Sequence, residues 1–125
     1  MVKIESGTFS KGSAGSSTVI LNDTTLVADL IFFWVTSAGA SDTVDHLGEG
    51  FMHALGQAAF TAFGDSTSSK SSADAGKCIE HNARISGTLT EIISASKTSI
   101  GTGDFTLNFS AANSSYQIHF LAIQF

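Results

Sequence analysis

The sequence contains no proline and little charge. Only 14% of its 125 residues are charged, against about 25% in an average soluble domain. The formal net charge is −5 and the six basic residues are scattered, so the chain offers no basic patch for a phosphate backbone and predicts no nucleic-acid partner. A weakly charged surface loses little hydration when it is covered, which favours a protein that packs against copies of itself or against a scaffold.

Cysteine and long apolar runs are also scarce. Cys78 is alone, which excludes an intramolecular disulfide, and no Cys or His spacing is typical of a zinc site. We interpret Cys78 as a buried apolar side chain. No segment approaches the roughly 20 apolar residues of a membrane span, and residues 1–10 lack the apolar core of a secretory leader. We therefore expect no membrane partner, and folding in the reducing cytoplasm of the cell that makes the protein.

Gly, Ser and Thr mark the turns between short segments in which apolar and polar residues alternate. Such segments, repeated about every ten residues, are typical of an antiparallel β-sandwich. We predict a single all-β domain over residues 1–125, jelly-roll-like, with about eight strands. The clearest predicted strands cover residues 3–10, 17–22, 26–39, 77–85, 87–97, 103–110 and 116–125.

The segment 46–63 fits either a helix or a pair of strands, because its apolar residues recur at helical spacing and also alternate. Gly48, Gly50 and Gly56 favour strands, since each glycine would cost a helix interior about 1 kcal/mol. We predict two strands that meet near Gly56. The Ser-rich segment 66–76 is predicted to be a loop.

Two predicted strands are apolar on both faces. Residues 30–35 have no polar face, so we expect them to lie between two layers, with Trp34 in the core. In residues 116–125, one face carries Tyr116, Ile118, Phe120 and Ala122, and the other carries Leu121, Ile123 and Phe125.

The segment 116–125 is therefore predicted to be a central strand. We expect residues 103–110 on one side of it and either 30–36 or 87–93 on the other. One of its faces fills the sandwich core, and the second needs another cover, from a loop or from another subunit. We expect a neighbouring copy in an oligomer to supply that cover.

No motif in the sequence indicates catalysis. The histidines, His46, His53, His81 and His119, lack the convergent spacing of metal ligands, and we expect His119 to be a partly buried, hydrogen-bonded structural residue. No Gly-x-Ser-x-Gly elbow is present, and the glycine clusters do not match phosphate-binding loops. We predict no catalytic, metal-binding or cofactor-binding residues and a protein that is not an enzyme.

The C-terminal sequence "GDFTLNFSAANSSYQIHFLAIQF" resembles the ending of small tailed-bacteriophage and prophage proteins. The segments "LVADLIFFWVTSAG" and "EGFMHALG" are similar to upstream strands of the same proteins. Together these segments cover about half of the chain. The resemblance implies a β-rich virion structural protein. A short chain without fibre repeats, coiled-coil heptads or an enzymatic site fits the capsid decoration, or cement, type within that class.

Such a protein is expected to form a homotrimer, to bind the outer surface of the major capsid protein lattice, and to stabilise the head. The expected location is the capsid surface of the virion, after synthesis in the bacterial host cytoplasm. Residues 1–16 are expected to be flexible or able to add a strand to a partner's sheet. The residues predicted to contact a partner are Ile4, Phe9, Lys70, Leu121, Ile123 and Phe125.

Two alternatives share this fold. A tail- or fibre-associated virion protein would differ in location alone. A carbohydrate-binding β-sandwich module would bind sugars through exposed aromatic side chains, although ten of the twelve aromatic residues are Phe, which lacks a polar group for sugar hydroxyls.

Overall fold

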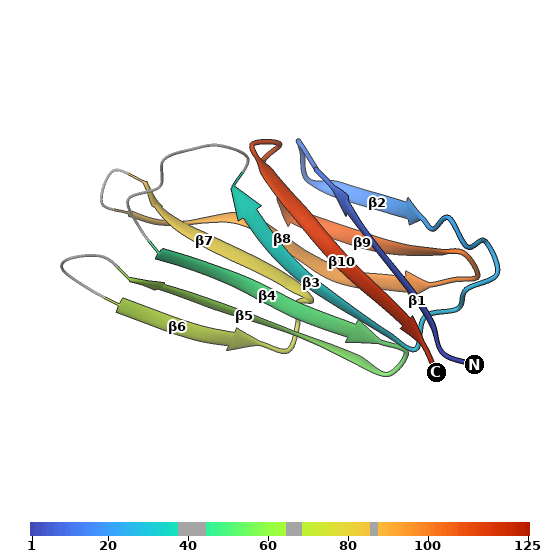
Figure 1. Cartoon of the computed structure of the whole chain (residues 1–125). Helices are drawn as coiled ribbons and strands as arrows, with labels where there is room; N and C mark the ends of the chain where they lie inside the picture. The colour runs from blue at the N-terminus through green and yellow to red at the C-terminus, as the bar shows by residue number, and fades with distance from the viewer. Residues whose placement is uncertain (38–44, 65–68, 86–87) are drawn as a thin grey trace.

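The computed structural model describes residues 1–37, 45–64, 69–85 and 88–125. These residues form ten β-strands and no helix (Figure 1). The strands are β1 (Lys3–Phe9), β2 (Gly15–Ile20), β3 (Leu30–Ser37), β4 (Asp45–His53), β5 (Gly56–Gly64), β6 (Ser69–Asp74), β7 (Ile79–Ile85), β8 (Thr88–Ile100), β9 (Asp104–Ala111) and β10 (Tyr116–Gln124).

The strands form two antiparallel sheets that pack face to face. The six-stranded sheet has the order β1-β10-β3-β4-β5-β6, and the four-stranded sheet has the order β2-β9-β8-β7. The predicted all-β antiparallel sandwich is confirmed, with ten strands where about eight were expected. As in a jelly roll, β1 and β2 lie beside β10 and β9 in opposite sheets, whereas β3–β6 and β7–β9 are meanders.

Aromatic residues from both sheets meet in the core. Strand residues alternate between faces, so each strand contributes every second side chain to the interior. The ring of Phe105 on β9 lies 5.7 Å from that of Phe33 on β3 and 5.2 Å from that of Phe120 on β10. The buried face of β10 is the predicted one, and it consists of Tyr116, Ile118, Phe120 and Ala122.

Glycine in β4 allows β7 to approach the six-stranded sheet closely. A Cβ atom at Gly50 would overlap the carbonyl oxygen of Cys78, and one at Gly48 would lie 2.8 Å from the carbonyl oxygen of Glu80. Only residues without a side chain fit beneath β7 at these two positions. The prediction of two strands in 46–63 is confirmed, and the turn between them lies at Ala54 and Leu55.

The predicted loop over 66–76 is wrong for most of its length. Residues Ser69–Asp74 form β6, an edge strand in which Ser71 pairs with Ala62 of β5. The Ser-rich composition of this segment lacks the apolar alternation that predicts a strand. An edge strand can form without it, because it needs backbone pairing on one side and few apolar side chains. Strand β8 is also longer than predicted and extends to Ile100.

The predicted pairing of β10 with residues 103–110 is wrong. Strand β10 pairs with β1 and β3, and β9 lies in the other sheet, because the chain crosses between sheets after Ala111. The alternative neighbour 30–36 is correct. The first segment pairs with β10 of its own chain, with Ile4 opposite Ile123, and it forms an edge strand of the six-stranded sheet.

The connection between β2 and β3 is held against β1 by a small polar network. The backbone N–H groups of Asn22 and Asp23 donate to the Glu5 carboxylate over 2.7 and 2.9 Å. The Asp23 carboxylate accepts hydrogen bonds from the hydroxyl and N–H of Thr25 and lies 3.1 Å from Lys3 Nζ. These bonds to the Thr25 hydroxyl and N–H, together with Lys3, lower the pKa of Asp23 to about 2.

We expect acid to weaken this network between about pH 4 and about pH 2. The folded-state pKa of Asp23 lies below its ordinary value of 3.8, so its stabilisation is complete above that value and is lost as the pH falls toward 2. An NMR titration of the folded protein is expected to give an Asp23 midpoint near 2. The stability difference between wild type and Asp23→Asn should shrink over the same range. A midpoint near 3.8 would show that the network is absent in solution.

Candidate functional site

Apolar side chains gather on the face of the six-stranded sheet that points away from the core. The large apolar residues described on this outer face are Ile4, Leu30, Phe32, Trp34, Phe51, Phe60, Leu121 and Ile123. Trp34 is 38% exposed and Phe60 is 45% exposed. The prediction that Trp34 belongs to the core is wrong: β3 buries Ile31 and Phe33, and strand alternation turns the residues between and after them outward.

The strand register arranges the outer face in rows. In one row, Leu121 of β10 lies opposite Phe32 of β3, which lies opposite Phe51 of β4. Directly opposed side chains in an antiparallel pair have Cβ atoms about 5 Å apart and contact each other. Residues far apart in the sequence therefore form a continuous apolar strip across adjacent strands.

The next row contains the polar side chains of His119 and Glu49 beside aromatic residues. His119 lies opposite Trp34, Trp34 opposite Glu49, and Glu49 opposite Phe60. The His119 ring stacks on Trp34 with centroids 5.3 Å apart, and its Nε2 atom lies 2.7 Å from the Thr36 hydroxyl. The prediction of a partly buried, hydrogen-bonded His119 is confirmed.

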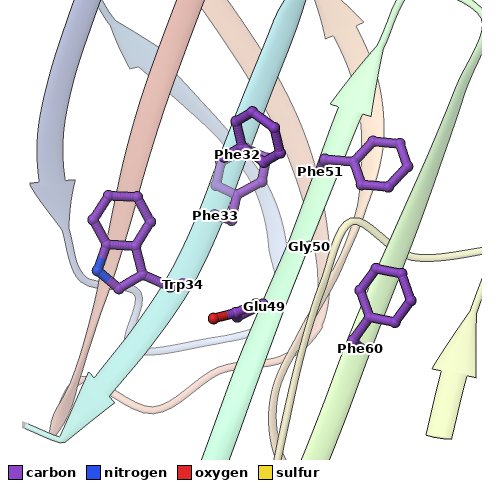
Figure 2. A pocket seen from close by; sticks show the side chains of 7 residues that line it. All are labelled: Phe32, Phe33, Trp34, Glu49, Gly50, Phe51 and Phe60. Carbon is purple, nitrogen blue, oxygen red and sulfur yellow. The ribbon is translucent and has the colours of Figure 1, made fainter.

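A pocket of about 260 Å³ opens between the two rows. Figure 2 shows Trp34 on one side of the Glu49 side chain and Phe60 on the other, with Phe32 and Phe51 farther along their strands. The pocket is lined by Phe32, Phe33, Trp34, Glu49, Gly50, Phe51 and Phe60. It combines aromatic walls with a single carboxylate, which suits binding better than proton transfer between paired acids.

Three of the predicted partner-contact residues lie together on the outer face. Ile4 is 64% exposed, and Leu121 and Ile123 are half-buried beside it on β10. Phe125 follows β10 and is 73% exposed, while its backbone N–H donates to the Asp29 carboxylate over 2.8 Å.

Phe9 and Lys70 are placed differently. Phe9 points into the sandwich, where its ring lies 6.5 Å from Phe105 and 6.4 Å from Phe109. It lies five positions along β1 from Ile4, and an odd number of positions along a strand reverses the face. The backbone of Lys70 in β6 pairs with that of Phe63 in β5, and the Lys70 side chain lies outside the described part of the chain.

The sequence reasoning missed the aromatic half of this site. Phe32 was assigned to a covered strand, and Phe51, Phe60 and Glu49 were not proposed. Alternation in β4 and β5 could have identified them. It places Glu49, Phe51 and Phe60 on one face of the sheet, and Gly48, Gly50 and Ala59 on the face toward the core.

The described histidines make separate contacts. His53 stacks on Phe51 at 6.1 Å, and His81 lies against Tyr116 at 5.2 Å. Within the described ranges, no three His, Cys, Asp or Glu side chains come together as a metal site requires. Those ranges also contain no helix long and apolar enough to cross a membrane.

Cys78 is fully buried, as predicted, and burial raises the pKa of its thiol to about 12. Because the thiolate is the reactive form, we expect no alkylation of the native protein at about pH 8, and full reaction of the single thiol after unfolding. Labelling with a chromogenic disulfide reagent checks this. Rapid labelling of the native protein would mean that β7 opens readily from the six-stranded sheet.

No protein-family model, curated protein or solved structure matches this chain.

Proposed function

We propose that this chain is a non-enzymatic structural protein of a tailed-phage particle, and specifically a capsid decoration protein. In this role it binds the outer surface of the major capsid protein lattice as a homotrimer and stabilises the head. The C-terminal sequence resemblance supports the phage assignment. The apolar outer face of the six-stranded sheet supports a role in binding and assembly, and it is the observation that carries the proposal.

The two outward faces of the sandwich differ sharply in polarity. Outward residues of β2 and β9 in the four-stranded sheet are Ser16, Thr18, Ile20, Thr106, Asn108 and Ser110. The outer face of the six-stranded sheet instead presents Trp, Phe, Ile and Leu. Monomers rarely expose contiguous apolar patches larger than roughly a few hundred Å². One face therefore suits water, and the other suits a protein partner.

Repetition would strengthen weak contacts on a capsid. Each copy of a symmetric oligomer presents the same surface, and a lattice repeats the matching site. Several simultaneous contacts then raise the overall affinity far above that of one contact. Low surface charge also favours binding, since few charged side chains lose their water when the face is covered.

Light scattering and co-sedimentation test the proposal. The purified protein is expected to have the mass of a trimer and to sediment with capsids that lack it. A monomer that stays in the supernatant would contradict the proposal. Localisation to the tail in the intact particle would instead support a tail- or fibre-associated protein.

A carbohydrate-binding module is the second candidate, and the pocket favours it. Trp34 offers an aromatic surface and Glu49 a hydrogen-bond acceptor, which together can hold a sugar ring. A glycan array with specific, saturable binding that Trp34→Ala removes would support this candidate. Absence of binding would exclude it for the glycans on the array.

A further inference from the structure

We infer that the pocket around Glu49 receives a basic side chain, an arginine or a lysine, from the capsid protein that covers the outer face. This inference deepens the proposed function and rests on it, because it specifies the chemistry of the partner. It follows from the position of one carboxylate among aromatic rings, from the lack of an ion pair to that carboxylate among the described residues, and from the size of the pocket.

The strand register fixes the position of Glu49 in the aromatic surface. Its row neighbours are Trp34 on β3 and Phe60 on β5, each directly opposite it. Phe32 and Phe51 occupy the next row, two residues along their strands on the same face. The carboxylate therefore lies between aromatic side chains on neighbouring strands, as Figure 2 shows.

Nothing in the described part of the chain neutralises Glu49. The ion pairs found there join Lys3 to Asp23 and Lys77 to Asp74, Glu80 and Glu91, and none includes Glu49. A partner that covered the outer face would remove water from this carboxylate. An ionised group that loses water without gaining a counter-charge strongly opposes binding. A compatible partner must therefore bring a positive charge to this position.

The aromatic walls favour the same ligand. A Lys or Arg cation is attracted to the faces of Trp and Phe rings, and a guanidinium also stacks flat against them. At about 260 Å³ the pocket is smaller than the roughly 300–1,000 Å³ of most small-molecule sites, so it suits one long side chain. Trp and Arg are also the residue types most enriched at the energetic centres of protein interfaces.

The single tryptophan provides a direct readout, because Trp34 lines the pocket. We would titrate the protein with N-acetyl-arginine amide and, separately, with N-acetyl-citrulline amide, which has nearly the same shape and no charge. The arginine amide is expected to change Trp34 fluorescence with millimolar affinity, and the citrulline amide to bind at least about fivefold more weakly. Equal responses, or none, would overturn the inference. A response to glucose and to neither amide would support the sugar-binding alternative.

Matched variants connect the pocket to capsid binding. Glu49→Gln removes the pocket charge, and Glu91→Gln removes one charge from β8 in the other sheet. In co-sedimentation, Glu49→Gln is expected to weaken capsid binding at least about 30-fold, and Glu91→Gln to leave it unchanged. Capsid binding that is equal in both variants would overturn the inference and leave the proposed function standing. Arginine-amide binding without any capsid binding would overturn the proposed function and leave the basic-side-chain site standing.

Discussion

Replacing both Phe32 and Phe51 by Ser is expected to abolish capsid binding and leave the sandwich folded. The two residues are directly opposed on the outer face, and neither belongs to the buried core. Each aromatic side chain at the centre of an interface contributes about 2 kcal/mol, so the double variant should raise the dissociation constant roughly a thousandfold. Co-sedimentation with capsids reports the binding, and circular dichroism reports the fold.

The matched control lies on the polar face. Thr18 and Thr106 are an opposed pair on β2 and β9, with their hydroxyl oxygens 2.9 Å apart. Changing both to Ala alters a cross-strand pair of the four-stranded sheet and should leave capsid binding intact. Loss of capsid binding in this control, or unchanged capsid binding in the Phe32/Phe51 variant, would place the binding surface elsewhere.

Gly50→Ala is expected to destabilise the fold by roughly 3 kcal/mol or more, at the upper end of the cost of overpacking a core. A Cβ atom at this position would overlap the carbonyl oxygen of Cys78, and a backbone atom has no alternative rotamer. Relief requires β7 to move away from β4, which opens the core between the sheets. Chemical denaturation measures the loss, and insoluble expression would be its extreme form.

Gly12→Ala is the control for the change in chain stiffness. A Cβ atom at Gly12 would lie 3.8 Å from Ser114 Cβ, an ordinary contact. Its effect should stay within about 0.5 kcal/mol, as for most surface changes. Similar losses in both variants would show that close packing beneath Gly50 is unimportant.

Alternation along each strand made most of the fold predictable. The two faces of β10 were assigned correctly, because Ile118 and Phe120 share one parity and Leu121 and Ile123 share the other. The segment 46–63 was also assigned correctly, because glycine destabilises a helix. The structure adds a second reason, since Gly48 and Gly50 lie where β7 approaches.

Pairing between strands was less predictable than the strands themselves. Nothing local in β9 or β10 shows that the chain crosses to the other sheet between them, so hairpin pairing was the wrong expectation. Strand β6 has too few apolar residues to be recognised without its partner. Trp34 was assigned to the core because its strand is apolar on both faces. The sequence of such a strand does not show whether its second face is covered by the same chain or by another.

The candidate site was half predictable for the same reason. Ile4, Leu121 and Ile123 were predicted to contact a partner because they are apolar residues that the core of the sandwich does not need. The pocket depends on which strands become neighbours, since Glu49 meets Trp34 and Phe60 only through the register of β3, β4 and β5. Local sequence does not encode that register in a readable form.

Image reconstruction of the intact particle tests the central claim most directly. The proposal predicts density for this ten-stranded sandwich on the outer surface of the capsid shell, with Phe32, Trp34 and Phe51 against a neighbouring protein chain. Density for the sandwich with this face open to solvent, and with the Ser- and Thr-rich face of β2 and β9 in contact with the shell, would contradict it.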